Sequence, residues 1–263
     1  FNTTASYDAA IANYFNKADN LVPEKLTLSY TLEDTLRYGE NPHQQGRFFG
    51  DFDAYFDKIQ GKEIFILDMG DISFPTGDIL VRDPLVWLNR NEMPYLQSVP
   101  KGRFRIETLV VKLEEDHYRY ALSRVKFREN LPVIYYEALK GDENLDGVDD
   151  DSIFGFNVDA GLATIVDVET RNAYCDFEDK WYAENPDKNI YDDFFAEIFA
   201  KSAEENPLYQ RDGGDWINFK IPNSELSIPM IQSGFGDGRY PVYFGYDEDG
   251  RLCDLVVEYI YLA

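Results

Sequence analysis

The sequence predicts an α+β fold: a mainly antiparallel sheet domain with few helices, preceded by a short helix–strand appendage. Short apolar runs recur through residues 64–263 with turn residues between them, and predicted strands outnumber predicted helices. The intervals between the runs are too short for the crossover helices that parallel strands need. The chain has 263 residues, of which 44% are hydrophobic, so it can bury a sizeable core.

The appendage covers residues 1–63. Apolar side chains at Tyr7, Ile11 and Phe15 recur at helical spacing, and Ser6 can cap the first turn. A breaking stretch follows, after which residues 25–30 alternate between apolar and polar as a strand does. The pattern then changes near residue 63, where we expect a domain boundary.

The second segment, residues 64–263, reads as a strand-rich domain. Two runs, at residues 103–112 and 118–128, flank a polar turn and predict a hairpin. One strong helical stripe stands later in the chain and stops before Pro207. Its members are Ile190, Phe194, Phe195, Ile198 and Phe199. Further strands at residues 216–221, 240–244 and 252–262 predict a closing meander.

The chain is strongly acidic, with 49 acidic and 25 basic residues and a formal net charge of −24. Nucleic acid and anionic membrane bind through clustered Lys and Arg, so this charge disfavours both. It suits a basic protein partner, although an acidic surface also serves solubility alone. No stretch has the length of a membrane span and no signal peptide is visible, so we expect a cytoplasmic protein. Cys175 and Cys253 are too few for a disulfide scaffold or a structural zinc site.

The most specific motif is the run Leu36-Arg37-Tyr38-Gly39-Glu40-Asn41-Pro42-His43-Gln44. With the residues around it, the run resembles the inter-domain segment of the bifunctional AICAR transformylase/IMP cyclohydrolase family. The resemblance implies that Arg37 clamps a phosphate of the aminoimidazole nucleotide and that Tyr38 lines the nucleotide site. Either the segment binds this nucleotide, or it docks on the second domain without a ligand.

The same family also needs a Lys-His-Asn-Asn run, whose histidine assists proton transfer. His43 and His117 are the only histidines of this chain, and neither follows a lysine. Formyl transfer without its general acid and base would lose several orders of magnitude in rate. We therefore do not expect catalysis from this chain alone.

Residues 64–263 carry a second resemblance. An ordered set of short motifs resembles the uncharacterised bacterial DUF4241 family, which implies a compact domain and brings no catalytic residues with it. These motifs are Pro75-Thr-Gly-Asp78, Asp83-Pro84-Leu85, Phe156-Asn-Val-Asp159-Ala-Gly161, Ser233-Gly-Phe-Gly-Asp-Gly-Arg-Tyr240 and Gly245-x-Asp247-x-x-Gly250.

The sharpest chemical pattern is an acidic run over residues 142–151. Its oxygen-bearing side chains match positions one, three, five and nine of a calcium loop: Asp142, Asn144, Asp146 and Asp150. Gly147 takes position six, but Ile153 takes position twelve, where such loops have a bidentate Glu. A bound calcium ion would therefore be held weakly. The alternative is a solvated acidic turn between two strands.

Three aspartates stand beside glycines or strand ends: Asp159, Asp167 and Asp237. We single out Asp159 and Asp237 as candidates for a cleft, with Asp167 to be compared with them. The glycines around Asp237 predict a tight hairpin turn, because a strand follows them where a phosphate loop would have a helix.

These patterns favour a non-catalytic interaction protein that carries an incomplete purine-enzyme segment. They include no histidine network, cofactor loop or complete metal site, and the charge suits a basic partner. The alternative is a purine biosynthesis component, an AICAR formyltransferase/IMP cyclohydrolase that binds the aminoimidazole nucleotide through Arg37 and Tyr38. A third hypothesis is a calcium-stabilised surface or secreted module.

Overall fold

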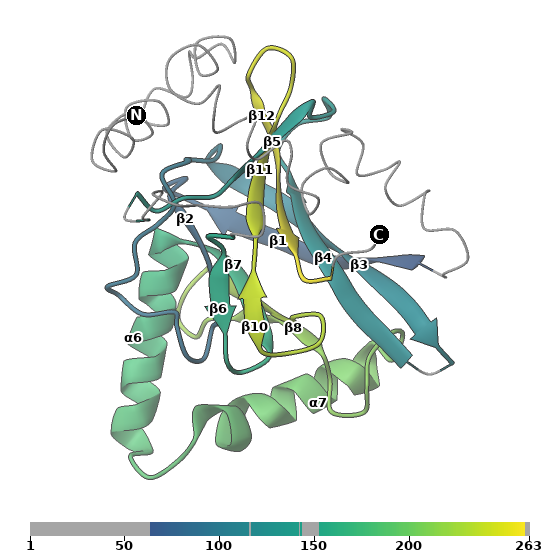
Figure 1. Cartoon of the computed structure of the whole chain (residues 1–263). Helices are drawn as coiled ribbons and strands as arrows, with labels where there is room; N and C mark the ends of the chain where they lie inside the picture. Colours follow the sequence, from purple (N-terminus) through teal and green to yellow (C-terminus); the bar gives the residue numbers. More distant parts are fainter. Residues whose placement is uncertain (1–63, 116, 142, 144–152, 261–263) are drawn as a thin grey trace.

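The computed structural model describes residues 64–115, 117–141, 143 and 153–260, so the helix and strand predicted within residues 1–63 lie outside the described residues. The described part is built of antiparallel strands with two main helices, which confirms the predicted α+β class. Figure 1 shows the larger sheet on one side of the molecule and the helices on the other.

The larger sheet has six strands in the order β1-β3-β4-β12-β11-β5. Their bounds are Ile64–Phe74 (β1), Gly102–Glu114 (β3), His117–Lys126 (β4), Leu252–Glu258 (β12), Val242–Tyr246 (β11) and Ile134–Glu137 (β5). The predicted hairpin is confirmed as β3 paired with β4, in a register that sets Glu114 opposite His117. Apolar runs on both sides of a short polar turn are sufficient to specify such a pair.

A second sheet has four strands in the order β2-β7-β9-β8, and a separate two-stranded ribbon joins β6 to β10. Their bounds are Ile79–Arg82 (β2), Leu162–Asp167 (β7), Ser227–Gln232 (β9), Trp216–Lys220 (β8), Phe156–Val158 (β6) and Gly238–Tyr240 (β10). The predicted hairpin at the glycines around Asp237 is wrong, because β9 and β10 belong to different sheets. The glycines still supply left-handed backbone, with φ of 50° at Gly234 and 108° at Gly236.

The helical layer comprises α6 (Val168–Glu184), a π-helical turn η3 (Tyr191–Phe195) and α7 (Ala196–Glu205). The predicted apolar stripe lies in η3 and α7 and at Ile190 before them. The sequence pattern does not predict α6, because its buried face includes Thr170 and Arg171 where a helical stripe would be apolar. Asp167 caps this helix by accepting a hydrogen bond from the backbone N–H of Glu169.

The four-stranded sheet is buried on both faces, which gives the described part three layers. Along β7, Ala163 and Ile165 pack in the core between the two sheets. Leu162 and Val166, which alternate with them, pack against the helical layer. The whole of β7 is therefore buried, and its sequence is a continuous run with only one polar side chain before Asp167.

Candidate functional site

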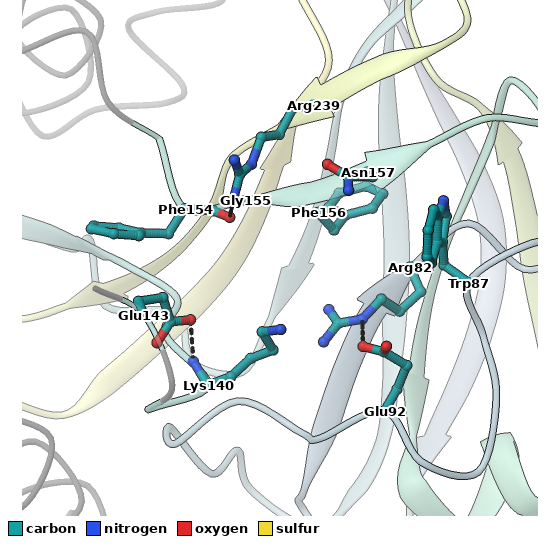
Figure 2. A pocket seen from close by; sticks show the side chains of 10 residues that line it. All are labelled: Arg82, Trp87, Glu92, Lys140, Glu143, Phe154, Gly155, Phe156, Asn157 and Arg239. Atoms are coloured by element: carbon teal, nitrogen blue, oxygen red, sulfur yellow. Dashed lines mark hydrogen bonds and ion pairs between the residues drawn. The ribbon is translucent and has the colours of Figure 1, made fainter. Parts of the chain in front are cut away.

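A pocket of about 360 Å³ opens where the end of β2, the turn after β5 and the β6–β10 ribbon meet (Figure 2). This volume is within the range of roughly 300–1,000 Å³ that is common for small-molecule sites. Ten residues line it: Arg82, Trp87, Glu92, Lys140, Glu143, Phe154, Gly155, Phe156, Asn157 and Arg239.

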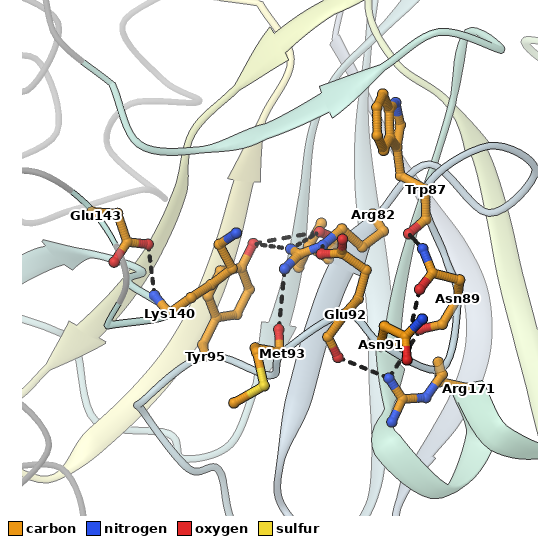
Figure 3. A network of polar contacts seen from close by, with 11 residues as sticks. Arg82, Trp87, Asn89, Asn91, Glu92, Met93, Tyr95, Lys140, Glu143 and Arg171 are labelled. Carbon is orange, nitrogen blue, oxygen red and sulfur yellow. Dashed lines mark hydrogen bonds and ion pairs between the residues drawn. The ribbon is translucent and has the colours of Figure 1, made fainter.

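Arg82, the last residue of β2, is the most buried charge at this pocket, with a side chain 5% exposed. Its Nε donates to Glu92 Oε2 at 2.7 Å, and its Nη2 donates to the carbonyl oxygen of Met93 at 3.1 Å. Its Nη1 donates to the carbonyl oxygen of Val81 at 2.7 Å and to the Tyr95 hydroxyl at 3.3 Å (Figure 3). A buried cation held by this many acceptors has a fixed position.

Tyr95 and Glu92 complete the surroundings of this guanidinium. Burial raises the pKa of Tyr95 to about 12, so its hydroxyl stays protonated at physiological pH. Glu92, whose side chain is 26% exposed, supplies the charge that balances Arg82. The pair is therefore a neutral unit at the inner wall of the pocket.

The loop that carries Trp87 and Glu92 is tied to α6. Arg171 donates through Nη1 to the carbonyl oxygens of Asn89 at 3.1 Å and Glu92 at 2.9 Å (Figure 3). Arg90 of the same loop pairs with Asp176 and Asp179 of the helix at 2.7 and 2.8 Å. The position of this wall of the pocket therefore depends on α6, a helix that the sequence pattern does not predict.

Asp83 holds the other end of the loop. Its carboxylate has no exposed surface. One oxygen accepts hydrogen bonds from the backbone N–H groups of Leu85 and Val86, and the other accepts from those of Asp159 and Ala160. Two of the motifs noted in the sequence, around Asp83 and around Asp159, therefore meet through one carboxylate.

Two further cations, Lys140 and Arg239, line other sides of the pocket. Glu143 accepts hydrogen bonds from the backbone N–H groups of Lys140 at 2.7 Å and Gly141 at 2.8 Å, which closes the turn that presents Lys140. Arg239 of β10 donates through Nη2 to the carbonyl oxygen of Phe154 at 2.8 Å. Figure 2 shows the ammonium group of Lys140 and the guanidinium of Arg82 pointing toward one another across the pocket.

The charges of the lining residues are three cations and two carboxylates. Their sum is positive, in a chain whose formal net charge is −24. Glu92 balances Arg82, so the positive excess of the lining comes from Lys140 and Arg239 against Glu143. This arrangement is suited to binding a negatively charged group.

Comparison with known proteins identifies the larger segment. A family model described as "Protein of unknown function (DUF4241)" matches residues 72–257, more than two thirds of the chain. The chain belongs to the DUF4241 family. A second model, the AICARFT/IMPCHase bienzyme, matches residues 1–75. No solved structure shows a significant match to the chain.

Curated relatives match mainly the segment in front of the DUF4241 domain. The bifunctional purine biosynthesis protein PurH of Bacteroides thetaiotaomicron is 44% identical over 73 residues, which cover 28% of this chain and 14% of that protein. PurH of Chlorobium luteolum is 38% identical over 163 residues, covering 54% of this chain and 29% of that protein. The chain therefore spans less than a third of the length of either relative.

The cleft candidates lie near this pocket without lining it. Asp159 is exposed and accepts a hydrogen bond from Trp87 Nε1 at 2.6 Å. Asp237 stands just before β10, where Gly238 pairs with Val158, so its turn adjoins that of Asp159. Asp167 lies at the far end of β7 and is fully buried, where it accepts from Thr76 and Gly77. Asp167 thus has a structural role, and a shared cleft of Asp159 and Asp237 stays a prediction.

The other predicted site residues lie outside the described residues. These are the nucleotide-binding pair Arg37 and Tyr38 and the calcium ligands Asp142, Asn144, Asp146 and Asp150. Both sites stay predictions. Of the described helices of the DUF4241 domain, none combines the length and the apolar character that spanning a membrane would take.

Sequence reasoning missed all five charged residues of the pocket: Arg82, Glu92, Lys140, Glu143 and Arg239. Two of them carry a signal that could have been used. Arg82 is a charge at the end of an otherwise apolar strand, directly before the Asp83 motif, and Arg239 is the variable position of the Gly-Asp-Gly-x-Tyr motif. Lys140 and Glu92 stand in polar stretches that give no such indication.

Proposed function

We propose that the DUF4241 domain is a cytoplasmic, non-catalytic interaction module that binds a basic partner. Residues 1–63 would be an incomplete purine-enzyme-like segment joined to it near residue 63. The observation that carries the proposal is the distribution of charge on the helical layer.

The helical layer is acidic. Residues 168–205 contain 11 acidic and 4 basic residues, and one of the basic ones, Arg171, is buried against the loop after β2. Most of the acidic side chains are exposed, including Asp187, Asp192 and Glu197. A surface of one sign accelerates encounter with a partner of the other sign and selects against partners of its own sign.

The buried carboxylates of the domain support binding over catalysis. Asp83, Glu137 and Asp167 each accept hydrogen bonds from backbone N–H groups. A carboxylate held in this way serves to fix loops, whereas a general acid or base must be within reach of a substrate with which it exchanges protons.

The test is binding of a fluorescently labelled oligolysine, followed by anisotropy at low and physiological salt. The variant Asp187→Asn/Asp192→Asn/Glu197→Gln removes three charges from the helical layer. A matched variant, Glu129→Gln/Asp212→Asn/Glu248→Gln, removes three exposed charges elsewhere. We expect roughly tenfold weaker binding for the first, at about 0.5 kcal/mol per charge, and a much smaller loss for the second. If both variants lost the same affinity for oligolysine, binding would depend on the overall negative charge of the chain. That result would refute a docking face on the helical layer.

A second candidate function is favoured by the similarity of residues 1–75 to a purine biosynthesis enzyme. In this alternative, Arg37 and Tyr38 bind the aminoimidazole nucleotide. Calorimetry of the full chain with this nucleotide would show binding that Arg37→Ala abolishes and Arg47→Ala leaves intact. No heat of binding at millimolar nucleotide would refute it.

A further inference from the structure

We infer that the pocket between β2 and the β6–β10 ribbon binds the oxyanion of a small organic ligand, a carboxylate or a phosphate, through Lys140 and Arg239. Nothing in the family match or in the names of the relatives assigns this site. It is separate from the acidic helical layer, so its test does not depend on the proposed function.

The first argument is the direction of the donors. Lys140 comes from the turn after β5 and points across the pocket, while Arg239 comes from β10 on its other side (Figure 2). Arg239 uses one of its five N–H groups to donate to the carbonyl oxygen of Phe154, and the same contact fixes the orientation of its fork. Cations from separate elements therefore line one space, which is the composition that anion sites use.

The second argument is the rigidity of the wall opposite Lys140. Arg82 and Glu92 are paired, and the Arg82 guanidinium is also held by Val81, Met93 and Tyr95. Because this guanidinium is almost saturated with acceptors and Glu92 balances its charge, its part is to hold this wall in place. A site that is already ordered loses less conformational entropy when a ligand binds.

The third argument is the size and remaining lining of the pocket. A lone phosphate or carboxylate would fill only part of 360 Å³. Apolar surface from Trp87, Phe154 and Phe156 completes the walls, and the Trp87 indole is held by its hydrogen bond to Asp159. The ligand class that fits is therefore a small molecule with one oxyanion and a flat or apolar body.

Two other pockets among the described residues do not offer this arrangement. One, beside β8, has Arg211 as its basic residue, and this guanidinium already pairs with the buried Asp215 at 2.6 Å. The other, beside α6, has Lys180 alone with Asp176 and Glu184. The number of cations that line it, three against one in each of the other two pockets, therefore distinguishes the site at Lys140 and Arg239.

The test uses the full chain and three ring compounds that differ in their head group: benzoate, phenyl phosphate and benzyl alcohol. Binding is measured by tryptophan fluorescence and by the shift in melting temperature. We expect benzoate or phenyl phosphate to bind and benzyl alcohol not to bind. The anion that binds with the higher affinity identifies the preferred head group, carboxylate or phosphate. Trp87→Phe should remove the fluorescence change and keep the melting shift, which locates the ligand.

Variants decide whether the named cations are responsible. Lys140→Gln and Arg239→Gln should each weaken binding of the better anion by roughly tenfold or more. Matched changes at exposed positions outside the pocket, Lys188→Gln and Arg103→Gln, should leave it within about twofold. The inference is overturned if neither anion binds at 20 mM (about the weakest affinity such a site could usefully have). The inference is also overturned if the pocket variants bind the better anion as tightly as the control variants do. This comparison holds when every variant has the same melting temperature as the parent chain without ligand.

Discussion

At the scale of single residues, the acidic side chains of this DUF4241 domain have two separate uses. Exposed ones give the chain its charge, while a few buried ones act as acceptors for backbone N–H groups. Asp83 joins the loop after β2 to the turn before β7, and Asp167 joins the turn before β2 to the start of α6. In sequence both classes are alike, so the distinction comes only from burial.

Asp83→Ala should lower the free energy of unfolding by about 3–5 kcal/mol. The change leaves four backbone N–H groups with no carboxylate to accept their hydrogen bonds, and such bonds to charged groups contribute about 1.5–3 kcal/mol each. Urea unfolding measures the difference. Asp187→Ala, at an exposed loop position, should change stability by less than about 0.5 kcal/mol. Similar losses for both variants would contradict the role given to Asp83.

Glu178 of α6 should make stability depend on pH. Burial raises the pKa of its carboxyl to about 8, the Tyr174 hydroxyl opposes this, and the charge of Asp179 adds to it. An unfolded glutamate titrates near about 4.3, so between about pH 5 and pH 8 unfolding releases a proton. The contribution of Glu178 therefore falls as pH rises through this window.

Glu178→Gln should remove that part of the pH dependence. We expect the free energy of unfolding of the variant to fall less between pH 5 and pH 8 than that of the parent chain. Glu184→Gln, at the exposed end of the same helix, is the control and should keep the parental slope. An unchanged slope in Glu178→Gln would show that this carboxyl titrates normally.

At the scale of elements, local pattern predicts some features and tertiary contacts decide others. The β3–β4 hairpin follows from two apolar runs and a polar turn. The helix α6 does not follow from its own pattern, since Arg171 on its buried face serves to hold the loop that carries Glu92. The hairpin predicted at residues 233–240 is wrong because tertiary contacts again decide the outcome. A turn directs the path of the chain, but it does not determine which strand the following strand pairs with.

The connection from α7 to β8 supplies an element-scale prediction. Gly214 has a φ of 81°, and a Cβ there would collide with the backbone carbonyl of Phe199. Gly214→Ala should therefore lower the free energy of unfolding by about 2–4 kcal/mol. Gly213→Ala is the adjacent control, because a Cβ at Gly213 meets nothing within 4 Å. Thermal or urea unfolding of the two variants compares them, and similar values would refute the predicted collision.

At the scale of the whole molecule, the described residues form three layers with a core on each side of the four-stranded sheet. The core between the sheets runs from Met69 in β1 to Tyr259 after β12, and the helical core is closed by Phe195 and Phe199. Charge is distributed with the layers: the helical face is acidic, and the pocket at the edge of the sheets collects three cations.

A chain that starts at residue 64 should fold cooperatively. Because residues from β1 to β12 already provide the two cores that flank the four-stranded sheet, we expect removal of residues 1–63 to shift the melting temperature by only a few degrees. Calorimetry of the shortened and full chains measures this. Loss of a cooperative transition would place part of the first segment in the core and would move the proposed boundary away from residue 63.

Four features can be predicted from the amino-acid sequence alone: the α+β class, the strand-rich second segment, the family of that segment and the purine-enzyme-like character of the first. These features follow from local periodicity and from short motifs, which can be recognised without knowing which strands pair in the sheets. The three-dimensional contacts were needed to show that Arg82, Lys140 and Arg239 line one pocket and that Asp83 and Asp167 are structural. The three cations are 58 to 157 positions apart along the chain, and long-range strand pairing and burial, which no local pattern encodes, place all five residues.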